Sequence, residues 1–551
     1  MPGVIISAMR LLPLLLLFPA ILEADTYPRQ TGIDVVHYQF RLTLSDDTDE
    51  IVGETSITVK FVVDKVGDIQ LDLANVSGGK GMTVASVRRG GAVDIPGPAS
   101  DALVYTHEQN RLRIVLPAAG RAGQEFTFTV RYRGIPAAGF LIGKNLHGDR
   151  TFFSDSWPNQ ARQWLPMVDH PYDKATGEFI VSAPEHYQVV ANGLLLEEYD
   201  LSAHMRRTHW KQSVPISSWL YALAVARFSS HHAGVVDGVP LQTWVYPQDR
   251  TAGQAVFEDQ SRRVLKFFND SIGPYPYEKL ANVQAPMEFG GVEYASAIFY
   301  EQKGVSSGRA PVAHEIAHQW FGDSVTERDW DDVWLSEGFA TYFALLFAEH
   351  DEGRDAFVDG LKRSRATIVQ TVQKMPDTPV IHRNIADMSK VLNGLVYQKG
   401  GWFLHMLRRE VGTEKFWEAI REYYRRYRDT NASTAELRAV FEHVTGKQLE
   451  GLFAQWLTRP GVPKIEGSWR YLPARKVVEV TLMQSQGADP YRVAVDIGIA
   501  AKPGELPRVE RMEFGGRTVT KTFTAETEPA SVTIDPETWL LMEAGAFTKR
   551  P

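Results

Sequence analysis

The segment His314-Glu-Ile-Ala-His318 constrains the fold of this chain more than any other feature. It follows a loop rich in glycine and serine, and Pro311 stands where a first helical turn tolerates proline. These signals predict a helix that ends near Gly322. Residues four apart on a helix share one face at a spacing of about 6 Å, so both imidazoles can bind one metal ion beside Glu315.

A third ligand is expected from Trp334-Leu-Ser-Glu-Gly-Phe-Ala340, where Glu337 stands at the start of a second amphipathic helix. Two histidines and one glutamate leave the fourth position of a tetrahedral zinc ion open for water, which is the catalytic pattern of zinc binding. The sequence therefore predicts one Zn²⁺ per chain and zinc-dependent hydrolysis. In that reading Glu315 is the general base and not a ligand. The alternative, four ordinary helical residues, is disfavoured because buried His and Glu side chains without a purpose are costly.

Composition limits the partners and the chemistry. The chain has 551 residues, a formal net charge of −8 and no cysteine. It lacks the cationic surface typical of nucleic-acid-binding proteins, so no nucleic-acid partner is expected. The absence of cysteine excludes disulfides, thiolate catalysis and cysteine-ligated metals, so any metal must use histidines and carboxylates.

The first 24 residues resemble an export signal. An apolar run from Leu11 to Leu22 follows Arg10, and the small residue Ala24 offers a cleavage point before Asp25. A helix of this run would cover about 18 Å, less than the roughly 30 Å of a bilayer core. We therefore expect residues 1–24 to be a signal peptide and the protein to be periplasmic or extracellular, without a permanent membrane span. The alternatives are that this segment is retained as an anchor, or that the start is wrongly assigned and translation begins at Met9.

Hydrophobic periodicity divides the remainder into three domains of an α+β multidomain protein. Alternating runs such as Thr58–Val63 predict a β-rich domain over residues 25–235. Helical spacing, as in Glu414–Tyr424, predicts a mainly helical domain over residues 236–462. Alternation returns in Tyr491–Ile499 and Ser531–Ile534, which predicts a small β-sandwich over residues 463–551.

The extended motifs His314-Glu-Ile-Ala-His-Gln-Trp-Phe-Gly322 and Trp334–Ala340 resemble the zinc signature of the aminopeptidase N family, the gluzincin exopeptidases. The resemblance covers roughly residues 33–463. It implies an N-terminal β saddle domain, a thermolysin-like catalytic domain and a zinc site between them. It also implies hydrolysis of the N-terminal peptide bond of peptides that carry a free α-amino group. Four further segments resemble family landmarks in the family's order: 161–174, 273–279, 396–400 and 456–461.

The resemblance also implies roles for residues outside the zinc motif. Gly290-Gly-Val-Glu-Tyr294 is an altered form of the family's exopeptidase signature, so Gly290, Gly291 and Glu293 are expected to bind substrate. A carboxylate at Glu293 can pair with the α-ammonium and fix the register of the peptide. Glu288 is the nearby competitor for this role. Tyr397, in Val-Tyr-Gln-Lys-Gly, matches the tyrosine that donates a hydrogen bond to the oxyanion.

One departure from the family concerns the second anchor for the substrate ammonium. The family commonly places a Gln or Glu where an ungapped count gives Trp157, and Asp155 lies two residues earlier. Either Asp155 supplies this anchor or Glu293 acts with less help.

Two other functions use the same residues. A thermolysin-like zinc endopeptidase would share the ligands but lack the amino-terminal ruler. A catalytically silent binding protein would keep the fold but usually lose a ligand or Glu315.

Overall fold

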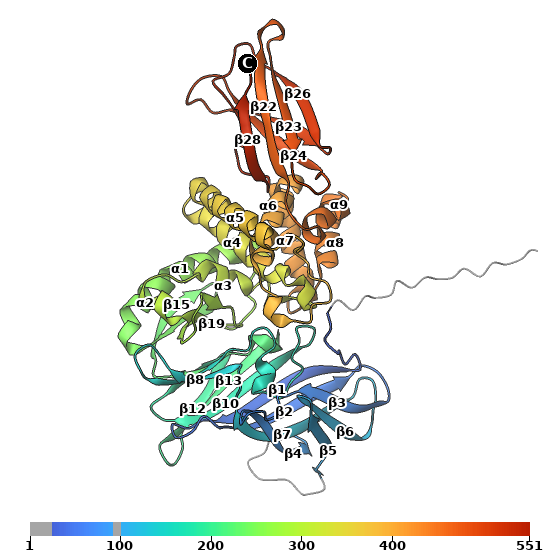
Figure 1. The fold of residues 1–551 in the computed structure, drawn as a ribbon. Coiled ribbons are helices and arrows are strands. Elements are labelled where there is room, and N and C mark those ends of the chain that lie inside the picture. The colour runs from blue at the N-terminus through green and yellow to red at the C-terminus, as the bar shows by residue number, and fades with distance from the viewer. Residues whose placement is uncertain (1–24, 92–100) are drawn as a thin grey trace, which may run out of the picture.

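The computed structural model describes residues 25–91 and 101–551. Figure 1 shows three parts along the chain: a β-rich N-terminal part, a middle part with most of the helices, and a β-sandwich at the C-terminal end. This agrees with the expected α+β multidomain fold. The predicted signal peptide, residues 1–24, lies outside the described residues. Within the described ranges, no helix combines the length and apolar character needed to cross a membrane.

The N-terminal part is built on a seven-stranded sheet of order β12-β13-β10-β1-β2-β7-β4. Its strand β1 (Ile33–Thr43) alternates buried and more exposed positions, as the period-two pattern predicted. Strands β1 and β10 pair in parallel, and the other pairs of this sheet are antiparallel. The remaining strands of the sheet are β2 (Ile51–Phe61), β4 (Gly81–Arg89), β7 (Glu125–Ile135), β10 (Lys174–Pro184), β12 (Leu194–Asp200) and β13 (Met205–Ser217).

Two smaller sheets complete this part. A three-stranded sheet contains β3 (Val66–Asp72), β5 (Val104–Glu108) and β6 (Arg111–Gly120). A four-stranded sheet contains β8 (Phe140–Lys144), β9 (Arg150–Ser154), β11 (Gln188–Ala191) and β14 (Leu223–Ala226). This second sheet contacts the middle part, because Phe153 on β9 packs edge-on against Phe299 of that part at 5.5 Å.

The middle part combines a sheet of order β15-β16-β17-β19-β18 with the helices. Its strands are β15 (Ser229–Val236), β16 (Val239–Val245), β17 (Leu280–Ala285), β18 (Gly291–Val292) and β19 (Ala297–Glu301). The expected domain boundary between residues 235 and 236 falls inside β15, which forms a hairpin with β16. Strand β15 therefore belongs to the sheet of the middle part, although its period-two pattern continues that of the preceding domain.

The helices are amphipathic, as their spacing predicted. In α7 (Thr413–Tyr427) the buried residues Phe416, Ile420 and Tyr423 recur at helical spacing. A short parallel pair, β20 (Val325–Glu327) and β21 (Thr430–Ala432), links this region to the segment after the zinc motif. The other helices are α1 (Arg250–Ser271), α2 (Gln302–Ser306), α3 (Val312–His318), α4 (Trp334–Asp351), α5 (Arg354–Lys374), α6 (Gly400–Val411), α8 (Thr434–Thr445) and α9 (Glu450–Phe453).

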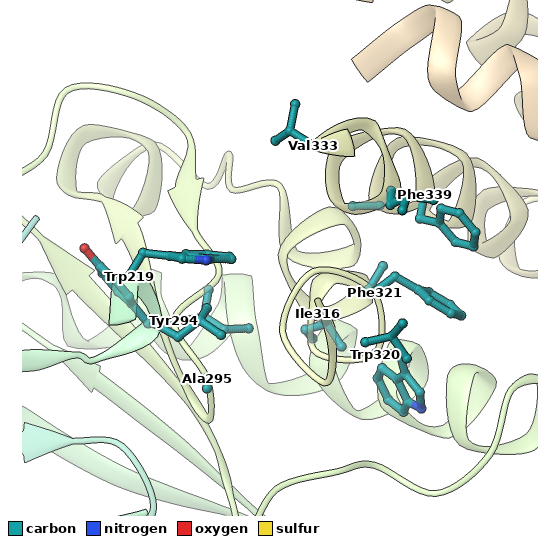
Figure 2. Packing of buried hydrophobic residues seen from close by; sticks show 14 of the residues in the cluster. Trp219, Tyr294, Ala295, Ile316, Trp320, Phe321, Val333 and Phe339 are labelled. Atoms are coloured by element: carbon teal, nitrogen blue, oxygen red, sulfur yellow. The ribbon is translucent and has the colours of Figure 1, made fainter. Parts of the chain in front are cut away.

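Aromatic side chains fix α3 against its neighbours. Phe321, just after α3, lies 4.6 Å from Phe339 on α4, and Trp320 lies 5.6 Å from Phe268 on α1. Figure 2 shows Ile316, Trp320, Phe321 and Phe339 gathered between these helices. Because all of these rings are buried, the helix that carries the two histidines is held by a dense apolar core.

The C-terminal part is a sandwich of two sheets. One has the order β26-β23-β22-β28 and the other β25-β24-β27. The predicted strands at Tyr491–Ile499 and Ser531–Ile534 correspond to β24 (Val493–Ala500) and β27 (Ser531–Ile534). The others are β22 (Lys464–Leu472), β23 (Val477–Gln484), β25 (Arg508–Phe514), β26 (Thr518–Thr524) and β28 (Glu543–Lys549). In Figure 1 this sandwich stands on the side of the middle part that carries α6 and α9.

Candidate metal centre

Helix α3 places His314 and His318 on one face, as the four-residue spacing predicted. Pro311 precedes its first residue, Val312, and both His314 N–H and Glu315 N–H donate to the Pro311 carbonyl. The two histidine Nε2 atoms lie 3.1 Å apart. His318 is buried, whereas the His314 side chain keeps 21% of its accessible surface. The pair therefore offers two nitrogen ligands at a partly open position.

Helix α4 brings Glu337 to this pair. Its Oε2 atom lies 3.4 Å from His314 Nε2 and 3.3 Å from His318 Nε2. Adjacent ligands of a tetrahedral zinc ion, with bonds of 2.0–2.1 Å, are separated by about 3.4 Å. The three atoms thus already have the spacing that zinc requires. Glu337 Oε2 is also buried without a hydrogen-bond partner among the described residues. A bound cation would compensate the charge of this atom.

Hydrogen bonds at the other ring nitrogen orient His318. Its Nδ1–H donates to the Phe321 carbonyl at 3.3 Å, and Ser336 Oγ lies 3.0 Å away. With the proton on Nδ1, the Nε2 lone pair faces His314 and Glu337 and is free for a metal. Gly322, at φ 116°, allows this contact, since a Cβ there would stand 2.3 Å from Ser336 Oγ.

The electrostatics of the cluster favour a bound cation. Burial raises the pKa of Glu337, but the positive charge of His318 and the close approach of both histidines outweigh this effect and lower the pKa to about 2. Burial lowers the pKa of His318, but Glu293 and Glu337 reverse the effect and raise it. Glu337 is thus held as an anion. The carboxylates around His318 stabilise a positive charge between the three side chains.

Glu315 and Glu293 lie next to the ligand triangle. Both are buried, and burial raises the pKa of each carboxyl group, that of Glu315 most strongly. Ligand-type atoms of Glu293, Glu315 and His318 all lie within 4.8 Å of one another. A carboxyl group with a raised pKa is suited to accept a proton from a water held by a metal and to return that proton later.

The loop before Glu293 approaches the site through its two glycines. Gly290 has φ 35°, and its carbonyl accepts a hydrogen bond from Glu301 N–H at 2.9 Å. Gly291 begins β18 and lies against the side chain of Glu315. The backbone of Glu293 itself is fixed by Gln319, whose Nε2 donates to the Glu293 carbonyl at 2.7 Å. Glu288, the competitor, is exposed on the same loop.

Tyr397 reaches the cluster from the π-helical turn η7 (Leu395–Lys399). Its ring stacks on that of His314 with 6.2 Å between centroids, and the charge of Glu337 acts on its hydroxyl. Burial and the nearby carboxylates raise the pKa of this hydroxyl above its usual range. The phenol therefore stays protonated and can serve as a hydrogen-bond donor at neutral pH.

The structure does not bring Asp155 into the ligand cluster. Asp155 follows β9, is exposed, and lines a small cavity with Met287, Val292 and Tyr294. It therefore lies beside the residues that flank Glu293. Trp157, the residue that the ungapped count reaches, packs edge-on against Trp330 at 5.5 Å.

Sequence reasoning missed Ser336 and Lys399. Both lie inside recognised motifs, but motif spacing does not show that Ser336 Oγ reaches the His318 ring, or that Lys399 Nζ reaches the carbonyls of Arg459 and Gly461. A polar residue directly before a ligand, as Ser336 before Glu337, is the available signal for an orienting partner.

Comparisons with known proteins agree with this geometry. The model of the peptidase M1 N-terminal domain matches residues 35–220, and that of the peptidase family M1 domain matches residues 257–456. Glutamyl aminopeptidase from Sus scrofa is 29% identical over 328 residues, which are 56% of this chain and 35% of that protein. Aminopeptidase M1-C from Oryza sativa subsp. japonica is 30% identical over 324 residues, 55% of this chain and 36% of that protein. The chain thus spans about a third of the length of these relatives.

Solved structures resemble the chain over most of its length. An M1 zinc metallopeptidase from Deinococcus radiodurans superposes with a TM-score of 0.66 at 26% identity, covering 78% of this chain and 95% of that one. A variant of that enzyme bound to a Tyr-Ser-Ala substrate gives a TM-score of 0.67 at 26% identity, covering 79% of this chain and 97% of that one. The two domain models and the shared architecture establish that the chain belongs to peptidase family M1.

Proposed function

We propose that this protein is a zinc aminopeptidase that removes N-terminal residues from peptides with a free α-amino group. The observation that carries the proposal is the position of buried Glu293, whose Oε1 lies 3.9 Å from His318 Nδ1, directly beside the ligand triangle. Glu293 Oε1 has no hydrogen-bond partner among the described residues. A carboxylate placed there can receive a substrate ammonium and so limit hydrolysis to the first peptide bond.

His314, His318 and Glu337 would hold one Zn²⁺ per chain. Bound there, zinc supplies Lewis-acid chemistry and lowers the pKa of water towards neutrality. Glu315 removes the proton of the attacking water and delivers it to the leaving amine. Tyr397 donates a hydrogen bond to the developing oxyanion, and Glu293 fixes the α-ammonium.

The first test is a panel of aminoacyl arylamides, assayed before chelation, after chelation and after zinc restoration. Activity should disappear with the metal and return with zinc, and elemental analysis should find one zinc per chain. Acetylated forms of the same substrates should be poor, because Glu293 then has no ammonium to bind. Hydrolysis of internal bonds in blocked peptides would point to an endopeptidase. A chain that neither binds zinc nor cleaves any substrate would contradict the proposal entirely.

We also propose that the protein is exported. The support is the sequence pattern of residues 1–24 alone. N-terminal sequencing of the protein recovered from the cell envelope and the medium should find a chain that begins at Asp25. Recovery of an uncut chain from the membrane fraction would favour the anchor.

A further inference from the structure

The ammonium group of Lys399 ends on backbone carbonyls and not on an acid. Its Nζ donates to the carbonyls of Arg459 at 3.1 Å and Gly461 at 2.9 Å. Lys399 is completely buried, and burial together with Arg459 lowers its pKa to about 7. A buried ammonium is costly unless its donors are satisfied, so these two carbonyls fix where the side chain ends.

The loop of residues 459–461 is held from its other side by the C-terminal sandwich. The Arg459 guanidinium lies 3.8 Å from the centroid of the Tyr491 ring and donates to the carbonyls of Asp489 and Pro490. The Tyr491 hydroxyl donates to the Pro460 carbonyl at 2.9 Å. The loop therefore forms a bridge between the sandwich and Lys399.

Lys399 belongs to the same π-helical turn as Tyr397, only two residues later. Gly400, the residue directly after this turn, packs closely on α4, since a Cβ there would stand 3.2 Å from the Cα of Gly338. Gly338 in turn follows the ligand Glu337. The turn is thus placed by α4 on one side and by the loop of residues 459–461 on the other.

From these contacts we infer that Lys399 is a positioning residue for Tyr397, and that the C-terminal sandwich supports the oxyanion hydrogen bond through it. This role rests on the proposed function, because the Tyr397 hydroxyl acts on an oxyanion only if the chain hydrolyses amides. The inference gives the sandwich a part in catalysis although none of its residues enters the ligand cluster.

The test compares Lys399→Met in the wild-type chain and in a Tyr397→Phe background. In the wild-type chain kcat should fall about 10- to 100-fold, because small misplacements of a catalytic group have effects of this size. KM should change less than about twofold and zinc content should stay at one per chain. In the Tyr397→Phe background, Lys399→Met should cause no further loss of kcat. Lys399→Arg should recover part of the rate, because a guanidinium can also donate to two carbonyls.

A milder variant tests the same bridge if Lys399→Met fails to fold. Tyr491→Phe removes only the hydroxyl that reaches Pro460, and it should lower kcat a few-fold, again only when Tyr397 is present. Tyr471→Phe is the matched control, because its hydroxyl donates to the Glu526 carbonyl elsewhere in the same sandwich. Equal losses with and without Tyr397, or no loss in either variant, would overturn the inference. An inactive wild-type chain would overturn the proposed function instead, and this role with it.

Discussion

Gly291 lies directly against the carboxyl group of Glu315. A Cβ built at Gly291 would stand 2.6 Å from Glu315 Cδ and 2.7 Å from Oε1. No real Cβ contact is this short, so a side chain at position 291 must displace either the loop or the carboxyl group. Gly291 is thus required by the carboxyl group of Glu315, the proposed general base, and this contact joins the loop before Glu293 to helix α3.

Gly291→Ala should therefore lower kcat/KM by about 100-fold while zinc content stays at one per chain, because it shifts Glu315 without touching a ligand. Gly143→Ala is the matched control, since a Cβ at Gly143 meets nothing within 4 Å. Steady-state kinetics with an aminoacyl arylamide and metal analysis of both variants provide the measurement. Wild-type kinetics for Gly291→Ala would show that the loop and Glu315 are not held together in solution.

Glu315→Gln should keep zinc and lose about 10²- to 10⁴-fold in kcat, which is the usual contribution of a positioned general base. Zinc should remain because the three proposed ligands are intact. Stopped assays with long incubation can measure the residual rate, and metal analysis of the same sample excludes loss of zinc. If turnover is unchanged, another group removes the proton from water.

The sequence predicted the local elements better than the contacts between them. The four-residue spacing of His314 and His318 determines their common face, and the apolar pattern of 414–424 corresponds to α7. In contrast, β15 was expected in the preceding domain but pairs with β16 in the middle part. A period-two pattern predicts a strand but does not say which sheet that strand joins. Pairing depends on partners distant in sequence.

The same limit applies to the site. The position of Glu337 beside the two histidines could be predicted from two helices and from the residue types that bind zinc. The surroundings of Asp155 and the carbonyls that Lys399 reaches depend on how distant loops pack, which no local pattern records. Asp155 therefore remains a prediction for substrate binding, and the structure adds only that it lies beside the residues flanking Glu293.

Glu293→Gln should selectively impair substrates with a free amino group. Loss of the carboxylate removes the charge that pairs with the ammonium, so kcat/KM for an aminoacyl arylamide should fall at least about 10-fold. The slow hydrolysis of the acetylated substrate should not change. Glu288→Gln, on the same loop but exposed, is the control and should behave like the wild-type chain. An equal loss with both kinds of substrate would mean that Glu293 acts on the chemistry and not on the ammonium.

His405 should make the protein less stable in acid. The side chain is buried on α6, its Nε2–H donates to the Thr538 carbonyl at 3.0 Å, and its ring stacks on Trp539 at 4.5 Å. Burial, reinforced by Arg354, Arg408 and Arg409, lowers its pKa to about 3.

The unfolded chain, in which this histidine has its usual pKa of about 6.5, therefore binds the proton first as the pH falls. The stability contributed by the neutral ring is complete above pH 6.5 and is lost as the pH falls from there towards 3. At pH 5 the loss is about 2 kcal/mol relative to pH 7.

Urea unfolding of the wild-type chain and of His405→Gln, at pH 5 and pH 7, measures this difference, because the zinc ligands are common to both chains. The variant should be less stable at pH 7 but depend less on pH, whereas His204→Gln, at an exposed site, should keep the wild-type dependence. Identical pH dependence in His405→Gln and the wild-type chain would show that this ring does not stay neutral in the folded protein.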